Sequence, residues 1–567
     1  MKAAEVLMHC LQKEGVEVLF GYPGGTVLPI YDVIYDFPIK HVLVRHEQGA
    51  AHAADGYARA NGKVGVCIAT SGPGATNLIT GIATAYMDSI PMVALTGQVG
   101  SALIGKDAFQ EADITGITLP ISKHTYQLKD PKDLPRIIRE AFYIASTNRP
   151  GPVVIDLPKN TMEADIKYDP HAEPKMQIPG YQLVPAPDPD SIAQAVRLIK
   201  AAKRPVLYVG GGAITAGASE EIIKLAEQMN IPVTTTLMGL GAFPSAHPLS
   251  LGMLGMHGSR YTNYAVSECD LLIAAGARFD DRVTGKLESF ASKARIVHLD
   301  IDPAEINKNV PVDVSVIANL KDSLQAINTL LANTEQHSGI EWQTTIARWK
   351  REFPLTYDDQ SDTGIMPQYI IEKLSELTQG QAIITTEVGQ NQMWAAQFYQ
   401  CKYPRTFLSS GGLGTMGYGL PAAIGAACAR DDVPVIDIAG DGSIQMNIQE
   451  LSTAVQYKLP VIICILNNHY LGMVKQWQAL FYNNRFSHTD MYEHQPDFVK
   501  LAEAYGAIGM RVTQKEQVET ALKQALQVKD RPVMIDFVVQ REANVFPMVP
   551  PGAAIINMLG GGTPDEN

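Results

Sequence analysis

The chain has 567 residues, of which 46% are hydrophobic, so it can bury several cores, and roughly three or four domains are expected. Its formal net charge is -13 and it has no long basic run, which argues against nucleic acid or an anionic membrane as the main partner. No apolar run approaches the roughly 18 residues of a membrane-spanning helix. A helical pattern begins directly after Met1, without a signal-like segment, so we expect a cytosolic protein.

The six cysteines are not arranged as C-x-x-C pairs, and most of them lie in apolar sequence. Reduced cysteine behaves as a small hydrophobic residue in such surroundings. We therefore expect neither a disulfide framework nor a zinc site from Cys10, Cys67, Cys269, Cys401, Cys428 and Cys464.

Short apolar runs alternate with amphipathic segments along most of the chain, which predicts α/β units on parallel sheets. Two stretches interrupt the alternation: residues 169–190 are rich in proline, and residues 334–365 contain two polar runs. We expect both to be linkers. They divide the chain into three predicted doubly wound domains and a tail, at residues 1–168, 191–333, 366–544 and 545–567.

In the first block, the strand expected at residues 41–45 leads into an alanine-rich helix, with Glu47 at the junction. Open α/β sheets place functional groups at such strand ends, although the helix dipole alone also favours a glutamate there. Strands expected at residues 17–20 and 64–69 each lead into a glycine-rich turn that lacks the lysine of a P-loop. The two turns and Glu47 together outline one crevice.

In the middle block, Gly210, Gly211 and Gly212 follow the strand expected at residues 205–209 and suit a turn around a phosphate. Asp300 and Asp302 end a later strand, where an acid can meet a ribose hydroxyl. Three glycines alone are a weak signal, but the combination indicates a dinucleotide site.

In the third block, Asp441 and Asn468 each follow an apolar run that is typical of a buried parallel strand. A carboxylate and an amide oxygen at neighbouring strand ends can converge on Mg²⁺, which prefers oxygen ligands and keeps phosphate oxygens among them. The alternative is an ordinary strand-to-helix turn, since Asp-Gly is a common turn pair. The spacing resembles the metal signature of enzymes that bind thiamine diphosphate, also called thiamine pyrophosphate.

Eight further segments, in order along the chain, resemble the acetohydroxyacid synthases, a family of thiamine diphosphate enzymes. The resemblance covers nearly the whole chain and is closest to the catalytic large subunits. The segments are Phe20–Gly25 (FGYPGG), Arg45–Ala50 (RHEQGA), Thr70–Asn77 (TSGPGATN), Asp107–Glu111 (DAFQE), Arg149–Lys159 (RPGPVVIDLPK), Gly276–Gly285 (GARFDDRVTG), Gly411–Ala423 (GGLGTMGYGLPAA) and Met473–Gln478 (MVKQWQ).

The resemblance implies a pyrimidine-binding first domain, a central domain that carries FAD without using it in the main reaction, and a diphosphate-binding third domain. It also implies an active site between the first domain of one subunit and the third domain of another. A homodimer or homotetramer follows, with a separate small regulatory subunit as a further partner.

The resemblance assigns roles to individual residues of the third domain and to Glu47. Glu47 corresponds to the glutamate that activates the cofactor, and Met416 to the bulky residue that bends it, which brings its reacting groups together. Asp441 and Asn468 correspond to the side-chain ligands of Mg²⁺, joined by the carbonyl of Tyr470. Contacts to the diphosphate are expected from Gly389, Gln390, Asn391, Gly414, Gly442 and Ser443.

Arg278 corresponds to the arginine that receives the carboxylate of a second 2-ketoacid, a task suited to a forked guanidinium. Trp477 corresponds to the residue that favours 2-ketobutyrate over pyruvate; the difference of one methylene limits that preference to about 1–3 kcal/mol. Further catalytic or substrate-facing positions are Gly25, Phe109, Gln110, Lys159, Met473 and Val388. FAD contacts are expected from Gly210, Gly211, Gly212, Met256, His257, Arg278, Asp300 and Asp302.

Three positions depart from the pattern of the family. Glu387, Asn391 and Asn160 stand where the family commonly has Asp, His and Asp. Asn391 lies beside the expected diphosphate contacts, so the departure bears on cofactor affinity. Because asparagine can still donate a hydrogen bond, we expect activity to be retained.

The activity implied is the decarboxylation of pyruvate and the condensation of the remaining hydroxyethyl unit with pyruvate or 2-ketobutyrate. It is the first common step towards valine, leucine and isoleucine. Two alternatives stay open at this point: a related enzyme such as a catabolic acetolactate synthase or a pyruvate oxidase, and a non-catalytic cofactor-binding protein on the same fold.

Overall fold

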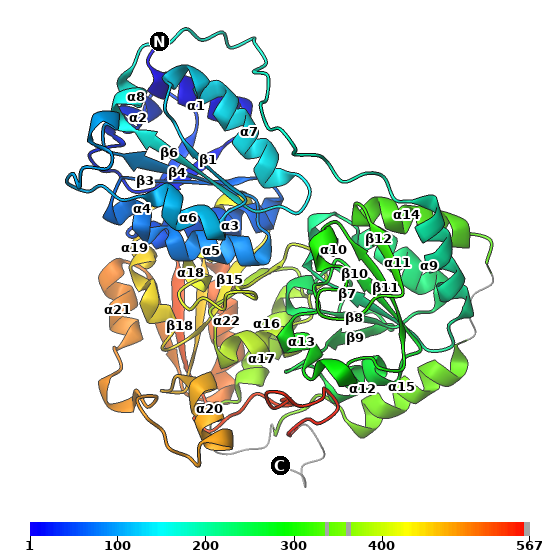
Figure 1. The fold of residues 1–567 in the computed structure, drawn as a ribbon. Coiled ribbons are helices and arrows are strands. Elements are labelled where there is room, and N and C mark those ends of the chain that lie inside the picture. Colours follow the sequence, from blue (N-terminus) through cyan, green and yellow to red (C-terminus); the bar gives the residue numbers. More distant parts are fainter. Residues whose placement is uncertain (335–338, 359–363, 561–567) are drawn as a thin grey trace.

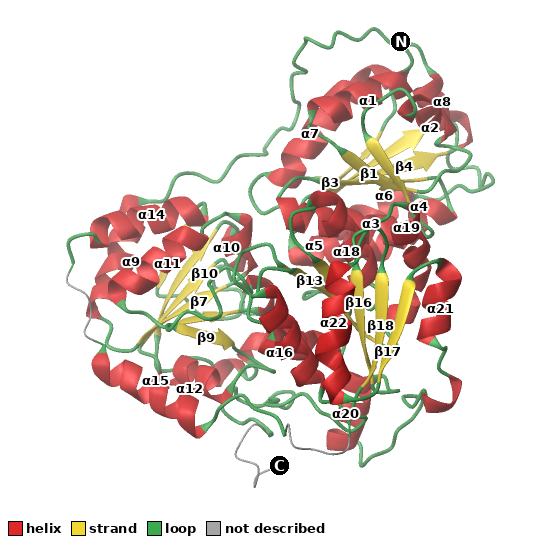
Figure 2. Ribbon diagram, turned by 180° about the vertical axis from the view of Figure 1, so that it is seen from behind, coloured by secondary structure: helices red, strands yellow, loops and turns green. Residues whose placement is uncertain are grey.

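Three parallel six-stranded sheets follow one another along the chain in the computed structural model, which describes residues 1–334, 339–358 and 364–560. Helices cover the faces of these sheets (Figures 1 and 2). The predicted fold class, three α/β domains on parallel sheets, is therefore confirmed. The domain boundaries proposed from the sequence stay predictions.

The first domain has the strand order β2-β1-β3-β4-β6-β5. Its strands are β1 (Val18–Gly21), β2 (Lys40–Leu43), β3 (Gly65–Ala69), β4 (Met92–Gln98), β5 (His124–Gln127) and β6 (Pro152–Pro158). Its helices are α1 (Ala3–Lys13), α2 (Leu28–Ile34), α3 (Glu47–Asn61), α4 (Pro73–Asn77), α5 (Ile79–Asp88), α6 (Ile114–Thr118), α7 (Leu134–Ser146) and α8 (Lys159–Glu163).

The middle domain has the strand order β12-β11-β10-β7-β8-β9. Its strands are β7 (Pro205–Val209), β8 (Val233–Thr235), β9 (Ser250–Met253), β10 (Leu271–Ala275), β11 (Arg295–Asp300) and β12 (Val314–Ile317). Its helices are α9 (Pro189–Ala201), α10 (Gly211–Thr215), α11 (Ser219–Met229), α12 (Arg260–Glu268), α13 (Asp281–Thr284), α14 (Leu320–Leu331) and α15 (Ile340–Glu352).

The third domain has the strand order β14-β13-β15-β16-β18-β17, which repeats the connectivity of the first domain. Its strands are β13 (Ile383–Thr386), β14 (Phe407–Leu408), β15 (Val435–Gly440), β16 (Ile462–Asn467), β17 (Ile508–Val512) and β18 (Val533–Val538). Its helices are α16 (Pro367–Thr378), α17 (Gln390–Phe398), α18 (Gly419–Ala429), α19 (Leu451–Gln456), α20 (Gly472–Phe481), α21 (Phe498–Tyr505) and α22 (Val518–Gln527).

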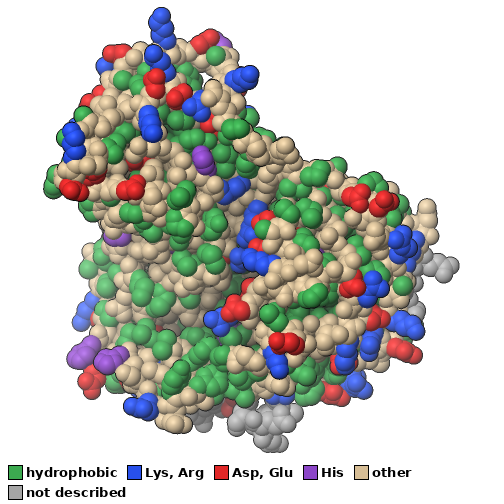
Figure 3. Space-filling view, in the orientation of Figure 1, with side chains coloured by type: hydrophobic (Ala, Val, Ile, Leu, Met, Phe, Trp, Pro, Cys, Tyr) green, Lys and Arg blue, Asp and Glu red, His purple; other side chains and the backbone are tan. Residues whose placement is uncertain are grey.

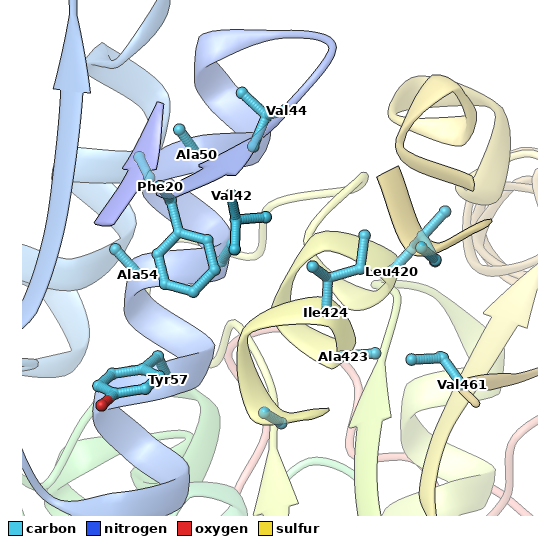
Figure 4. Close-up of a cluster of buried hydrophobic side chains, with 14 of the residues drawn as sticks. Phe20, Val42, Val44, Ala50, Ala54, Tyr57, Leu420, Ala423, Ile424 and Val461 are labelled. Carbon is cyan, nitrogen blue, oxygen red and sulfur yellow. The ribbon is translucent and has the colours of Figure 1, made fainter. Parts of the chain in front are cut away.

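Helices α3 and α18 cross in direct contact and join the first domain to the third. One hydrophobic cluster contains side chains from both domains, and Figure 4 shows the two helices side by side within it. A Cβ at Gly56 would collide with the backbone of Ala422, and a Cβ at Gly425 would collide with the carbonyl oxygen of Ala53. Glycine at these two positions therefore lets the helix backbones meet.

The segments between the domains differ in structure. Residues 164–188 contain no helix or strand and run over the surface from α8 to α9 (Figure 1). The segment predicted as a second linker contains α15, whose Trp342 and Ile346 are buried in a core of the middle domain. The described part of the tail packs against the middle domain, where Val549 N–H donates to the Met256 carbonyl and Asn263 Nδ2 donates to that of Ile555.

All six cysteines are free thiols, and five of them are buried. Among the helices of the described residues, none combines the length and the apolar character that crossing a membrane requires.

Replacing Gly425 with alanine tests the close helix crossing. Alanine is the better helix former, so any loss of stability must come from the new Cβ meeting Ala53. We expect overpacking to lower the free energy of unfolding by about 1–3 kcal/mol, measured by thermal or denaturant unfolding. Ala347→Val on the exposed face of α15 adds more side chain without meeting another helix; an equal loss in that control would contradict this explanation.

Candidate functional site

The metal and diphosphate residues predicted in the third domain lie together at the carboxyl ends of its strands. Asp441 follows β15 and Asn468 follows β16, which pair side by side with Gly440 opposite Leu466. Gln390, at the start of α17, links them to the rest of the domain: its Oε1 accepts from Asn468 Nδ2 at 3.0 Å, and its Nε2 donates to Gln476 Oε1 at 2.9 Å. Gln476 lies within the segment Met473–Gln478 that carries the resemblance, but the sequence analysis gave it no role.

Asp441 is almost fully buried, and none of the ion pairs between described residues supplies it with a lysine or arginine. Its carboxylate accepts a hydrogen bond from Gln495 Nε2, a partner that sequence reasoning missed. Burial raises the pKa of Asp441 from its ordinary value of 3.8 to about 7. A cation at this carboxylate would compensate the buried charge, so the residue fits a metal ligand.

The other ligands expected at this site from the sequence are an amide oxygen of Asn468 and the backbone carbonyl of Tyr470. No group of three or more His, Cys, Asp or Glu side chains within the described ranges could hold a metal ion. A cation here would depend on few protein ligands and on phosphate oxygens, which is the coordination that Mg²⁺ accepts.

Asn391 presents an acceptor to the predicted diphosphate site. Its Nδ2 donates to the carbonyls of Glu387 and Ile438 at 2.9 and 2.8 Å. Its Oδ1 lies beside Gly389 and Gly440, where a Cβ on either glycine would approach it. Both amide hydrogens of Asn391 are therefore used within the domain, and its contact with the diphosphate stays a prediction.

Glu387 joins two loops that flank the same site. It is fully buried, and its carboxylate accepts from the backbone N–H groups of Gly417 and Leu420 at 2.6 and 3.2 Å. These bonds cap the N-terminus of α18, where the helix dipole favours negative charge. Burial raises the pKa of Glu387 and of the neighbouring Asp437.

Glu47 begins α3 and is buried at the strand ends of the first sheet. Its Oε2 accepts from Asn77 Nδ2 at 2.9 Å, and Gly74 lies against its other oxygen. Glu450 of the third domain holds the residues just before it, because its Oε1 accepts from the N–H groups of Arg45 and His46, both at 2.9 Å. Neither Asn77 nor Glu450 was identified as an interacting residue from the sequence.

The other first-domain candidates lie on loops and at the start of α8, near these strand ends. Phe109 is 88% exposed, and the backbone of Gln110 lies against Gly72. Lys159 begins α8, and the neighbouring Asn160 accepts from the Ser101 N–H at 2.7 Å. Gly25 lies in the exposed turn after β1. No hydrogen bond or ion pair among the described residues joins this first-domain group to Asp441 or Asn468.

A cleft of about 910 Å³ lies between the middle domain and the other two. Figure 3 shows basic side chains gathered along this junction. The cleft brings together candidates from three predicted sites, the flavin, substrate and diphosphate sites, which therefore adjoin one continuous space. They are Gly210, Gly211, Gly212, Met256, His257, Arg278, Asp300, Val388, Gly414, Met473 and Trp477.

Asp302 is placed differently from the other flavin candidates. Its Oδ2 accepts from Arg149 Nη1 of the first domain at 3.0 Å, and the same guanidinium reaches Glu305 at 2.6 Å. Arg149 lines the cleft, whereas Asp302 does not. An ion pair between two domains thus occupies the carboxylate that was expected to meet a ribose. Arg278 also bridges domains, since its Nη1 donates to the Met87 carbonyl at 3.0 Å.

Family comparisons identify the class of this chain. Residues 1–117 match the N-terminal TPP binding domain of thiamine pyrophosphate enzymes, residues 192–327 their central domain, and residues 387–537 their C-terminal TPP binding domain. The chain is thus a thiamine pyrophosphate enzyme with two TPP-binding domains around a central one.

Full-length relatives narrow the class to a family. The acetolactate synthase large subunit of Parasynechococcus marenigrum is 53% identical over 566 residues, which cover 99% of this chain and 91% of the relative. A probable acetolactate synthase large subunit of Methanocaldococcus jannaschii is 50% identical over 566 residues, covering 99% and 95%. The large subunit of Corynebacterium glutamicum is 50% identical over 560 residues, covering 98% and 89%. The chain belongs to the acetolactate synthase large-subunit family, and the resemblance noted in its sequence is confirmed.

The raised pKa of Asp441 predicts a pH-dependent stability of the metal-free protein. The folded state holds the proton more tightly than the unfolded chain does, so this contribution is largest below about pH 4 and is lost as the pH rises towards 7. Between pH 5 and 7 the loss is about 2 kcal/mol. Thermal unfolding without divalent cations should show this slope in the parent and less of it in Asp441→Asn; identical slopes would contradict the prediction.

Proposed function

We propose that this chain releases CO₂ from pyruvate and joins the remaining two-carbon unit to a second 2-ketoacid. The products would be 2-acetolactate from pyruvate and 2-aceto-2-hydroxybutyrate from 2-ketobutyrate, the first common step of branched-chain amino acid biosynthesis. One observation carries the proposal: Glu47 and the pair Asp441–Asn468 are buried at strand ends of the two TPP-binding domains. The named relatives, all acetolactate synthases, support it.

Thiamine pyrophosphate, when bound, supplies the carbon nucleophile for both decarboxylation and carbon–carbon bond formation. The proposed task of Glu47 is to hold a proton at the aminopyrimidine ring, and the amide of Asn77 fixes the orientation of its carboxylate. Burial of Glu47 keeps water from competing for that proton. Met416, half-buried on the loop before α18, is proposed to keep the cofactor bent.

Mg²⁺ is the cation that we propose for Asp441, Asn468 and the carbonyl of Tyr470, with Ser443, Gly442, Gly389 and Gln390 around the diphosphate. FAD is proposed for the cleft. The cleft's volume of about 910 Å³, its lining by residues of three domains and the close packing of Gly210 and Gly212 against Gly276 support a dinucleotide there. A purified protein with a flavin absorption spectrum would support this assignment, and a colourless one that binds no added FAD would count against it.

The two halves of the catalytic site lie on separate parts of this chain, which supports a working unit of at least two copies. Glu47 and Asp441 share no bonded partner within the described residues, so we propose that the first domain of one copy completes the site on the third domain of another. The printed name "large subunit" of the relatives also supports a small regulatory subunit as a partner. Six free thiols are compatible with the cytosolic location that we propose.

Arg278 and Trp477 line the cleft together with Met473, and we propose that they select the second 2-ketoacid. The guanidinium is proposed to receive the carboxylate. The indole, held edge to face against Phe481 at 5.7 Å between ring centroids, is proposed to contact the alkyl group. Phe109, Gln110 and Lys159 are proposed to line the substrate path from the first domain of the other copy.

Replacing Glu47 with glutamine should lower acetolactate formation by about 10²–10⁴-fold, because an amide cannot exchange the proton. The measurement is CO₂ release from pyruvate with thiamine pyrophosphate, Mg²⁺ and FAD present. Glu220→Gln, on the first turn of α11 in the middle domain, is the matched control and should retain parent turnover. Near-parent turnover in Glu47→Gln would overturn the assignment of Glu47. A parent protein that releases no CO₂ would overturn the proposed function itself.

Replacing Trp477 with leucine should weaken the preference for 2-ketobutyrate over pyruvate. The contact with one methylene is worth about 1–3 kcal/mol, so the product ratio should change by roughly tenfold or more. A competition assay with both 2-ketoacids measures the two products together. Phe481→Leu removes only the aromatic partner of Trp477 and should shift the ratio less. An unchanged ratio in Trp477→Leu would exclude Trp477 as the selecting residue.

A further inference from the structure

The loop between β14 and α18, residues 409–418, contacts both predicted cofactor sites. It carries Gly414 and Met416, which are proposed to face thiamine pyrophosphate, and residues 410–414 line the cleft proposed for FAD. The conformation of this loop therefore sets the positions of Gly414 and Met416. The loop contains no helix or strand, so its conformation must be set by contacts with other parts of the chain.

Third-domain residues hold part of the loop, since Gln392 donates to the Ser410 carbonyl and Glu387 accepts from the Gly417 N–H. The first domain supplies further contacts at both ends. Asp88, the last residue of α5, accepts from the Gly412 N–H at 2.7 Å and from the Gly411 N–H at 3.2 Å. Arg59, on α3, donates to the Ser409 carbonyl at 3.0 Å. At the other end, the Tyr418 hydroxyl donates to Asp55 at 2.6 Å.

A fourth contact lies next to Met416 itself. The hydroxyls of Thr415 and Thr84 are 2.8 Å apart, and both are buried. The Thr84 hydroxyl donates its hydrogen to the Thr80 carbonyl at 2.8 Å. Thr415 must therefore be the donor in the bond between the two hydroxyls. Four anchors from α3 and α5 thus hold ten residues of the third domain.

The anchors form one charged cluster. Arg59 pairs with Asp55 at 2.6 Å and with Asp88 at 2.8 Å, and the side chains are 7%, 0% and 0% exposed. The two carboxylates raise the pKa of Arg59 despite its burial, so the guanidinium stays charged. Burying charged groups costs free energy of desolvation. In this cluster the carboxylate oxygens of Asp88 also accept hydrogen bonds from the backbone of the 409–418 loop. Gly412 also lacks the Cβ that would meet Asp88.

We propose that Asp88, held by Arg59, is a positioning residue for catalysis, acting through the 409–418 loop on Met416 and Gly414. The proposal rests on the proposed function. Asp88 itself lines the cleft proposed for FAD; its proposed role is to set, through the N–H groups of Gly411 and Gly412, the distance at which the loop meets thiamine pyrophosphate. A displacement of about 1 Å at a reacting group can lower turnover by about 10²-fold, so the four first-domain anchors of this loop have catalytic value beyond stability.

Asp88→Asn tests the proposal, because the amide keeps the shape but turns one acceptor into a donor facing N–H groups. We expect hydrogen exchange at the Gly411 and Gly412 amides to accelerate in the cofactor-free protein. We expect kcat for acetolactate formation to fall by about 10²-fold. Binding of thiamine pyrophosphate with Mg²⁺, measured by calorimetry, should change by less than about threefold, because Asp441 and Asn468 share no hydrogen-bond partner with Asp88 among the described residues.

Glu140→Gln is the matched control. Glu140 is another fully buried acid of the first domain, paired with Arg136 and a backbone N–H, and its partners lie outside the loop. It should lose stability without the selective loss of kcat. An Asp88→Asn variant with parent kcat, or with kcat and cofactor affinity lost in equal measure, would overturn the positioning role.

Thr84→Val decides the case if Asp88→Asn does not fold. It removes the acceptor for Thr415, together with the bond from Thr84 to the Thr80 carbonyl, and leaves the charged cluster intact, so kcat should fall while folding and cofactor affinity persist. Unchanged kcat in Thr84→Val would then overturn the proposal. The exchange measurement needs no turnover, so a parent protein without CO₂ release would defeat the proposed function while the loop anchors could still be observed.

Discussion

The contact between helices α3 and α18 is the constraint on which the rest of the structure depends. Two small-residue faces bring the backbones together at Gly56 and Gly425, where any side chain would force the domains apart. Dispersion contacts and burial act over the whole crossing. Once it forms, the third domain's Glu450 reaches the backbone before Glu47, and the first domain's Asp88 reaches the backbone of the 409–418 loop. Each domain therefore shapes a site-forming segment of the other.

Buried acids recur near these junctions, and their charge is compensated in different ways. Glu387 and Glu450 accept backbone N–H groups, Asp55 and Asp88 share the guanidinium of Arg59, and Asp441 accepts from the amide of Gln495. Burial costs a carboxylate its hydration unless donors or a cation replace it. Among the described residues no lysine or arginine pairs with Asp441, and burial raises its pKa to about 7, which fits the metal-ligand role proposed for it. The other four are engaged by the protein itself and serve to hold backbone in place.

Much of the architecture could be predicted from the local pattern of apolar and polar residues, because a buried parallel strand is a short apolar run in the sequence. The strand expected at residues 205–209 matches β7, and the helix expected after the second strand begins at Glu47. The turns after β15 and β16 were sufficient to predict that Asp441 and Asn468 are neighbours. The fold class followed from the same alternation of strands and helices.

The contacts missed from the sequence are those between residues distant along the chain. The bond from Gly412 to Asp88 spans 324 residues, and the pair of Arg149 with Asp302 spans 153. No periodicity or turn signal marks such partners, since their meeting depends on how complete domains dock. Asn391 shows the same limit at short range: its residue type left a donor available, but the carbonyls of Glu387 and Ile438 use both of its hydrogens.

Helix α3 carries both the glutamate proposed to activate the cofactor and the charged residues that hold the 409–418 loop. Glu47 stands at its first residue, and Asp55 and Arg59 lie 8 and 12 residues later. At about 1.5 Å per residue, Arg59 is about 18 Å along the helix axis from Glu47. In the proposed dimer Glu47 serves the other copy's cofactor, whereas Arg59 and Asp88 hold the loop that faces this copy's own cofactor. A rigid helix of this length would then connect two catalytic centres. A shift of α3 against α18 would move both groups together, and the close packing at Gly56 and Gly425 opposes that shift.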